Sequence, residues 1–209
     1  PTGAAADVLA KESFDYPASA SLADKAGGDG WANPWQVRGT ANLHPNPATV
    51  DGAPCFGNSA ALDRNTRAIR RLDVAQGGPF DAAGLVDDGR IGKPGTVLYV
   101  GFLQRVSTVP VVTPGRPDYL RFYAFELNTS DQDATRVLEI GHDDRCNPPD
   151  GPWYGAASVA NNGRHDHEPG QFRSLGSQDA EASQIVVKLT FGPDHRDRAE
   201  IFRNPESRT

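Results

Sequence analysis

The chain has 209 residues, 37% of them apolar, which is enough to bury the core of one domain or at most two. Its 21 Lys and Arg against 27 Asp and Glu give a net charge of −6, which argues against a nucleic-acid or anionic-membrane surface, because such surfaces bind through clustered cations. The 22 Gly and 17 Pro exclude a mostly helical protein, since both residues destabilise helix interiors.

Apolar and β-branched patterns predict short strands in chain order. The clearest is 182–191, where Val187, Leu189 and Phe191 alternate with polar residues, while 96–104 is almost continuously apolar, as in a strand buried on both faces. One short helix is expected, at 79–87. The predicted strands are 66–72, 96–104, 119–127, 136–141, 182–191 and 198–202.

Clusters of Gly, Pro, Asn and Asp separate these strands and predict turns. They lie at 27–30, 46–47, 77–79, 87–89, 113–115 and 148–151. Strands at such intervals, without a βαβ rhythm, predict an all-β, antiparallel β-sandwich. No repeat, low-complexity tract or linker interrupts the chain, so residues 1–209 are expected to form a single domain. No stretch approaches the ~20 apolar residues of a membrane span, so no membrane insertion is expected.

The two cysteines, Cys55 and Cys146, cannot form a tetrahedral zinc site without histidine partners. Both lie in turn-like polar sequence, which favours a disulfide over two free thiols if the protein is exported. The segment 4–10 is too short for an intact signal peptide and lacks a charged flank. The absence of Met suggests a segment processed or excised from a longer precursor.

The order of several motifs indicates a more specific fold. The segment 12–17 is followed by Gly27-Gly28-Asp29-Gly30-Trp31 and then by Trp35. Further motifs continue this order at 57–60, 99–103, 139–141, 153–155, 185–191 and 202–205. Together they resemble a jelly-roll domain of the concanavalin A-like lectin/glucanase superfamily, of the laminin-G-like kind found in secreted bacterial surface proteins.

The resemblance implies a jelly-roll β-sandwich that is secreted or displayed on the cell surface, with a polysaccharide or glycan as its partner. We expect a monomer that acts as a non-catalytic carbohydrate-binding or structural and adhesive module. The alternative is a glycan-cleaving enzyme, either a glycoside hydrolase or a polysaccharide lyase. Retaining glucanases of this superfamily carry a Glu-x-Asp-x-x-Glu strand that pairs two carboxylates. No such run occurs in this sequence, since Glu126 is followed by Leu127-Asn128 and Glu139 stands alone. No catalytic residue is therefore predicted.

Calcium is the cofactor that the resemblance implies, because such jelly rolls often carry a hard cation between their first and last strands. Carboxylate and carbonyl oxygens suit Ca²⁺. Glu12 or Asp15 could meet Asp194 or Asp197 in this way, unless they are ordinary surface carboxylates. His165 and His167 would share one face of a strand and could hold a transition metal, although their flanks favour a solvated loop.

Aromatic residues supply the predicted glycan contacts, because the faces of sugar rings stack on exposed aromatic rings. Trp31 and Trp35 are expected to fix the N-terminal turn in the core instead. The predicted platform consists of Trp153, Tyr154, Tyr119 and Tyr123. An excess of 17 Arg over 4 Lys adds bidentate donors for the carboxylates or sulfates of acidic glycans, or reflects only genome composition.

Overall fold

The computed structural model is all-β, with antiparallel pairing in every sheet of the residues it describes. These residues are 7–45, 57–63, 66–105, 124–128, 136–142, 153–158, 172–177, 181–193 and 196–205. Within them, the only α-helix is α1, with four residues, as the Gly and Pro content predicts. No helix in this part of the chain is long and apolar enough to cross a membrane.

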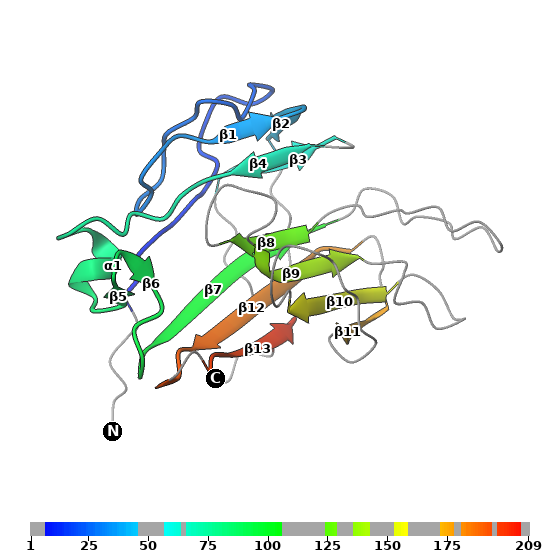
Figure 1. Cartoon of the computed structure of the whole chain (residues 1–209). Helices are drawn as coiled ribbons and strands as arrows, with labels where there is room; N and C mark the ends of the chain where they lie inside the picture. The colour runs from blue at the N-terminus through cyan, green and yellow to red at the C-terminus, as the bar shows by residue number, and fades with distance from the viewer. Residues whose placement is uncertain are drawn as a thin grey trace.

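The part of the chain from β7 onward contains the two larger sheets (Figure 1). One has three strands in the order β13-β12-β7, and the other has four in the order β11-β10-β9-β8. The strands of the first sheet are β7 (Val97–Gln104), β12 (Ser183–Thr190) and β13 (Arg198–Arg203). Those of the second are β8 (Ala124–Asn128), β9 (Arg136–His142), β10 (Trp153–Ser158) and β11 (Phe172–Ser177).

The two larger sheets share one apolar core. Leu138 and Ile140 of β9 are buried in the same cluster as Ile185 and Val187 of β12. Alternate residues of a strand lie on opposite faces, so this cluster marks the inner face of each sheet. Half-buried side chains from the neighbouring strands complete it: Val100, Phe102, Leu175, Leu189 and Ile201.

Arg203 adds a polar link between the two sheets. Its Nε atom donates to Ser183 Oγ at 3.0 Å within the three-stranded sheet, and its guanidinium reaches the Leu175 carbonyl oxygen of β11 at 3.5 Å. The two sheets are therefore joined by apolar packing and by this side chain.

The N-terminal part forms two short antiparallel ladders around a second apolar cluster. Leu22, Ala41 and Leu43 are buried there, and Phe14, Tyr16 and Trp35 pack against them. A two-stranded hairpin follows further along the chain, and its Asp88 and Gly89 have positive φ angles, as a two-residue turn requires. The elements are β1 (Gln36–Arg38) with β4 (Arg67–Ile69), β2 (Ala41–His44) with β3 (Ser59–Leu62), α1 (Pro79–Ala82), and β5 (Val86–Asp87) with β6 (Arg90–Ile91).

The structure confirms most of the predicted strands with shifted bounds. The strands predicted at 96–104, 136–141, 182–191 and 198–202 correspond to β7, β9, β12 and β13. The prediction that 96–104 is buried on both faces is wrong, because β7 is an edge strand of its sheet and Tyr99 on its outer face is 58% exposed. Strand β4 is shorter than the predicted 66–72, and only the end of the predicted 119–127 falls within the described residues, as β8. The helix expected at 79–87 ends at Ala82, because Gly84 takes a positive φ of 71° that α-helical residues do not adopt.

Candidate functional site

The four-stranded sheet has a face turned away from the shared core, which we call the outer face. Leu138 and Ile140 define the inner face, because they are buried in that core. Residues paired directly opposite each other in an antiparallel sheet lie on the same face, so the strand register assigns the neighbouring positions. The outer-face positions that this pairing assigns on β8, β9 and β10 are Ala124, Glu126, Glu139, Gly141, Gly155 and Ala157. Trp153 follows the same alternation along β10, next to a register shift in the ladder between β10 and β11.

Two glutamates are directly opposite each other on this face. Glu126 of β8 pairs with Glu139 of β9, which lies 13 positions further along the sequence. Like charges directly opposite each other destabilise an antiparallel pair. The pairing of Glu126 with Glu139 therefore does not itself stabilise the sheet.

Trp153 follows the outer-face alternation of β10, and the positions between it and this pair are small. Gly155 pairs with Gly141, and Ala157 pairs with Glu139, so the central strands carry almost no side-chain volume there. By the same alternation Tyr154, which pairs with His142, lies on the inner-face register. Of the two predicted platform residues on β10, Trp153 follows the outer-face alternation and Tyr154 does not.

Several predicted site residues lie outside the described part of the chain. They are Tyr119, Tyr123, His165, His167, Asp194, Cys55 and Cys146. The histidine site and the Cys55–Cys146 disulfide therefore stay predictions.

Glu12, a predicted calcium ligand, lies in a polar cluster of the N-terminal part. Its carboxylate accepts hydrogen bonds from the Phe14 backbone N–H at 2.7 Å and from Tyr16 Oη at 3.0 Å. Trp35 Nε1 donates to it at 2.9 Å, and the guanidinium of Arg70 forms an ion pair with it. Both charged side chains are buried, at 3% exposure for Arg70 and 8% for Glu12, so the pair is shielded from water.

Arg70 is held from several sides. Its guanidinium carbon lies 5.1 Å from the ring centroid of Trp31 and 5.6 Å from that of Trp35, within the range of cation–π attraction. Its Nε atom donates to the Asn33 carbonyl oxygen at 3.0 Å. The two tryptophans therefore belong to this interior cluster, which agrees with the prediction that they fix the N-terminal turn.

Tyr16 is expected to ionise later than an ordinary tyrosine. Burial raises the pKa of Tyr16 above its usual 10.0, and the hydrogen bond that its hydroxyl donates to Glu12 raises this pKa further. Since the neutral form is favoured in the fold, this contribution to stability is present below pH 10.0 and is lost as the pH rises through the folded-state pKa. An ultraviolet titration of tyrosinate should show a late-titrating tyrosine in the wild-type protein whose signal is lost in Tyr16→Phe. Superimposable curves for the two proteins would contradict this assignment.

The other described calcium candidates are exposed. Asp197 Oδ1 accepts a hydrogen bond from the Gly192 backbone N–H at 3.1 Å, just before β13, and Asp15 lies on the N-terminal segment. Among the described residues, no group of three or more His, Cys, Asp or Glu side chains is placed to hold a metal ion.

The Glu126–Glu139 pair is the feature that sequence reasoning missed. Each glutamate is isolated in the sequence, whereas the Glu-x-Asp-x-x-Glu pattern places both carboxylates on one strand. The detectable signal was that both lie in predicted strands, at alternating positions beside the apolar residues Leu127 and Ile140. Comparisons of the chain with protein-family models, with curated proteins and with solved structures found no match.

Proposed function

We propose that this chain is a non-catalytic glycan-recognition module of a secreted or cell-surface protein, built as a concanavalin A-like jelly-roll β-sandwich. Two antiparallel sheets around one core support the architecture. The order of the sequence motifs supports the superfamily. Adhesion or a structural role in a larger surface protein is included in this proposal.

The outer face of the four-stranded sheet carries the proposal. A glycan site needs an aromatic residue for the sugar face, acceptors for hydroxyl groups and room for the ring. Trp153 provides the aromatic ring. Glu126 and Glu139 provide the hydrogen-bond acceptors. The small residues Gly141 and Gly155 provide the room for the sugar ring.

Replacing Trp153 with Ala is expected to weaken glycan binding by about tenfold, the loss of one aromatic stacking contact. The melting temperature should change by no more than about 2 °C, as for a surface substitution in a chain of this size. A glycan array identifies the ligand, and calorimetry with that ligand gives the affinity. Leu62→Ala, at a residue that is 49% exposed on β3, is the matched control.

Two results would contradict the assignment of Trp153. Unfolding of Trp153→Ala would make the residue part of the core, and an unchanged affinity would place the glycan elsewhere.

Running the glycan array with and without calcium tests whether glycan binding depends on this ion. If calcium joins Glu12 or Asp15 to Asp194 or Asp197, chelation should lower the melting temperature without abolishing binding, since a ligand of the folded state alone stabilises it.

A second candidate function is glycan hydrolysis, and the Glu126–Glu139 pairing favours it. Retaining glycoside hydrolases hold two carboxyl groups ~5–5.5 Å apart. Directly opposite residues of an antiparallel pair have Cβ atoms ~4.5–5.5 Å apart, so this register is compatible with such a pair. Incubating the wild-type protein with each glycan that it binds distinguishes the two functions, because only the enzyme releases new reducing ends.

A further inference from the structure

The three-stranded sheet also has an outer face, on the opposite side from the shared core. Its inner positions, such as Val100 and Val187, pack in that core, so the alternate positions point away from it. We call this surface the Tyr99 face and define it by Tyr99, Gly101, Lys188, Arg198, Glu200 and Phe202.

Two aromatic rings are exposed on the Tyr99 face. Tyr99 is 58% exposed and Phe202 is 44% exposed, although large aromatic residues are usually buried. They come from the outer strands β7 and β13, one on each side of β12. Gly101, beside Tyr99 on β7, has nothing within 4 Å of the place where a Cβ atom would lie, so the surface is open there.

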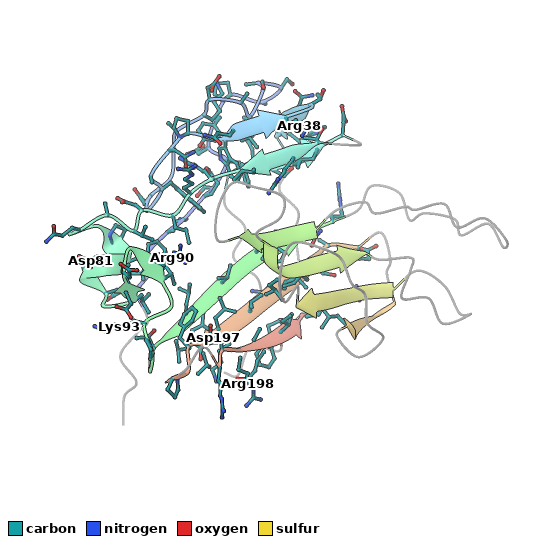
Figure 2. All side chains as sticks on the ribbon, viewed as in Figure 1. Arg38, Asp81, Arg90, Lys93, Asp197 and Arg198 are labelled. Atoms are coloured by element: carbon teal, nitrogen blue, oxygen red, sulfur yellow. The ribbon has the colours of Figure 1, made fainter. Side chains whose placement is uncertain are left out.

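A network of charges extends across this face from the central strand β12 to the edge strand β13. Lys188 Nζ on β12 lies 3.0 Å from Glu200 Oε2, and the Arg198 guanidinium lies 3.1 Å from Glu200 Oε1. The hydrogen bond from Lys188 is the main cause that lowers the pKa of Glu200, so its carboxylate stays ionised. Arg198, labelled in Figure 2, is 72% exposed and keeps donors for a ligand.

Two cations against one carboxylate leave this face with an excess of positive charge in a chain whose net charge is −6. A positive patch on an acidic protein is complementary to an anionic partner. The carboxylate groups of a uronic acid match the planar donors of Arg198. The exposed rings of Tyr99 and Phe202 match the apolar faces of the sugar rings.

We propose that the Tyr99 face is a second glycan-contact surface, which binds acidic, uronate-containing polysaccharide. Tyr99 and Phe202 stack on separate sugar units, and Arg198 binds a carboxylate. The two positions lie two strand spacings apart across β12 and two residues apart along the strands, and the resulting distance of roughly 12 Å is one that an oligosaccharide bridges. A protein partner fits less well, since Lys188 lies on the central strand of this face and charged residues are depleted from the centre of protein interfaces.

This surface is distinct from the outer face that carries Trp153. The two faces belong to different sheets and lie on opposite sides of the shared core. A protein with both would hold two polysaccharide chains at once, which is a cross-linking activity that one glycan site does not provide.

Calorimetry with oligogalacturonate, beside a neutral cello-oligosaccharide of equal length, tests the proposal. Tyr99→Ala and Phe202→Ala should each weaken oligogalacturonate binding by about tenfold with the melting temperature preserved. Arg198→Gln should weaken oligogalacturonate binding and reduce its salt dependence. Leu62→Ala, another exposed apolar residue, serves as the control. Trp153→Ala should leave the oligogalacturonate affinity unchanged. The proposal for the Tyr99 face can therefore fail without the proposal for the Trp153 site, and the reverse also holds.

Three results would overturn the proposal. The wild-type protein could fail to bind oligogalacturonate at low ionic strength. Tyr99→Ala could bind it with wild-type affinity. Light scattering could show that Tyr99→Ala and Phe202→Ala change only the oligomeric state, which would make the Tyr99 face an interface between copies of the chain.

Discussion

Replacing Arg70 with Met is expected to lower the free energy of unfolding by about 3–5 kcal/mol, because it leaves the Glu12 carboxylate buried without its counter-charge. The Glu12 side chain is only 8% exposed, so water cannot replace the guanidinium. Methionine keeps much of the apolar volume between Trp31 and Trp35, and the substitution therefore tests the charge rather than the packing.

The remaining hydrogen bonds do not compensate. Phe14, Tyr16 and Trp35 still donate to the carboxylate, but each is a neutral donor. Removing one partner of a buried ion pair costs more than the pair contributes, since the other charge keeps its full desolvation penalty. For a chain of this length the loss corresponds to a fall of roughly 6–20 °C in melting temperature.

Arg38→Met is the matched control. Arg38 is an exposed arginine on β1, the strand paired with β4, and it is labelled in Figure 2. Its replacement should change the free energy of unfolding by less than about 0.5 kcal/mol. The double variant Glu12→Gln with Arg70→Met should recover part of the loss, because it removes both charges. Equal stabilities for Arg70→Met and Arg38→Met would mean that Glu12 is not charged and buried in solution.

The strands that the sequence predicts well are those with the strongest pattern. In β12 the buried Ile185 and Val187 alternate with half-buried residues, and β7 is long and apolar. Local composition does not encode partners, however, so the pairing of β12 with both β7 and β13 comes only from the structure.

The strands that the sequence missed carry little apolar signal. Strand β10 reads Trp-Tyr-Gly-Ala-Ala-Ser and β11 reads Phe-Arg-Ser-Leu-Gly-Ser, both rich in small residues that strands usually lack. Small residues let a ligand approach the backbone of a strand closely. The same small residues that make β10 and β11 hard to predict from the sequence therefore make the outer face a candidate site.

The polar cluster shows why Glu12 is hard to interpret from sequence. Its ion-pair partner Arg70 lies 58 residues further along the chain, and nothing in either local pattern links them. A calcium ion bound by Glu12 would compete with the Arg70 guanidinium for the same carboxylate. If Glu12 binds calcium, removing Arg70 removes this competition, so EDTA should lower the melting temperature of Arg70→Met more than that of the wild-type protein.

Gly30→Ala is expected to destabilise the protein by about 2–5 kcal/mol, through backbone strain and through steric overlap. Gly30 has a φ of 76°, which alanine adopts at a cost. An added Cβ atom would overlap the Leu9 carbonyl oxygen and lie 2.7 Å from the Ala10 Cα atom. The turn at 27–30 lies against this segment, since Lys11 and Asp29 exchange backbone hydrogen bonds of 3.0 Å.

Gly77→Ala separates the two causes. Gly77 has nearly the same φ, 77°, but nothing lies within 4 Å of its added Cβ atom. Its replacement should therefore cost only the strain of the left-handed conformation, about 1–2 kcal/mol. The excess for Gly30→Ala, measured by urea unfolding of both variants, reports how closely the turn packs on residues 9–11. If the two substitutions cost the same, the Gly-Gly-x-Gly-Trp turn does not hold the N-terminal segment in solution, and the support that this motif gives to the jelly-roll assignment is lost.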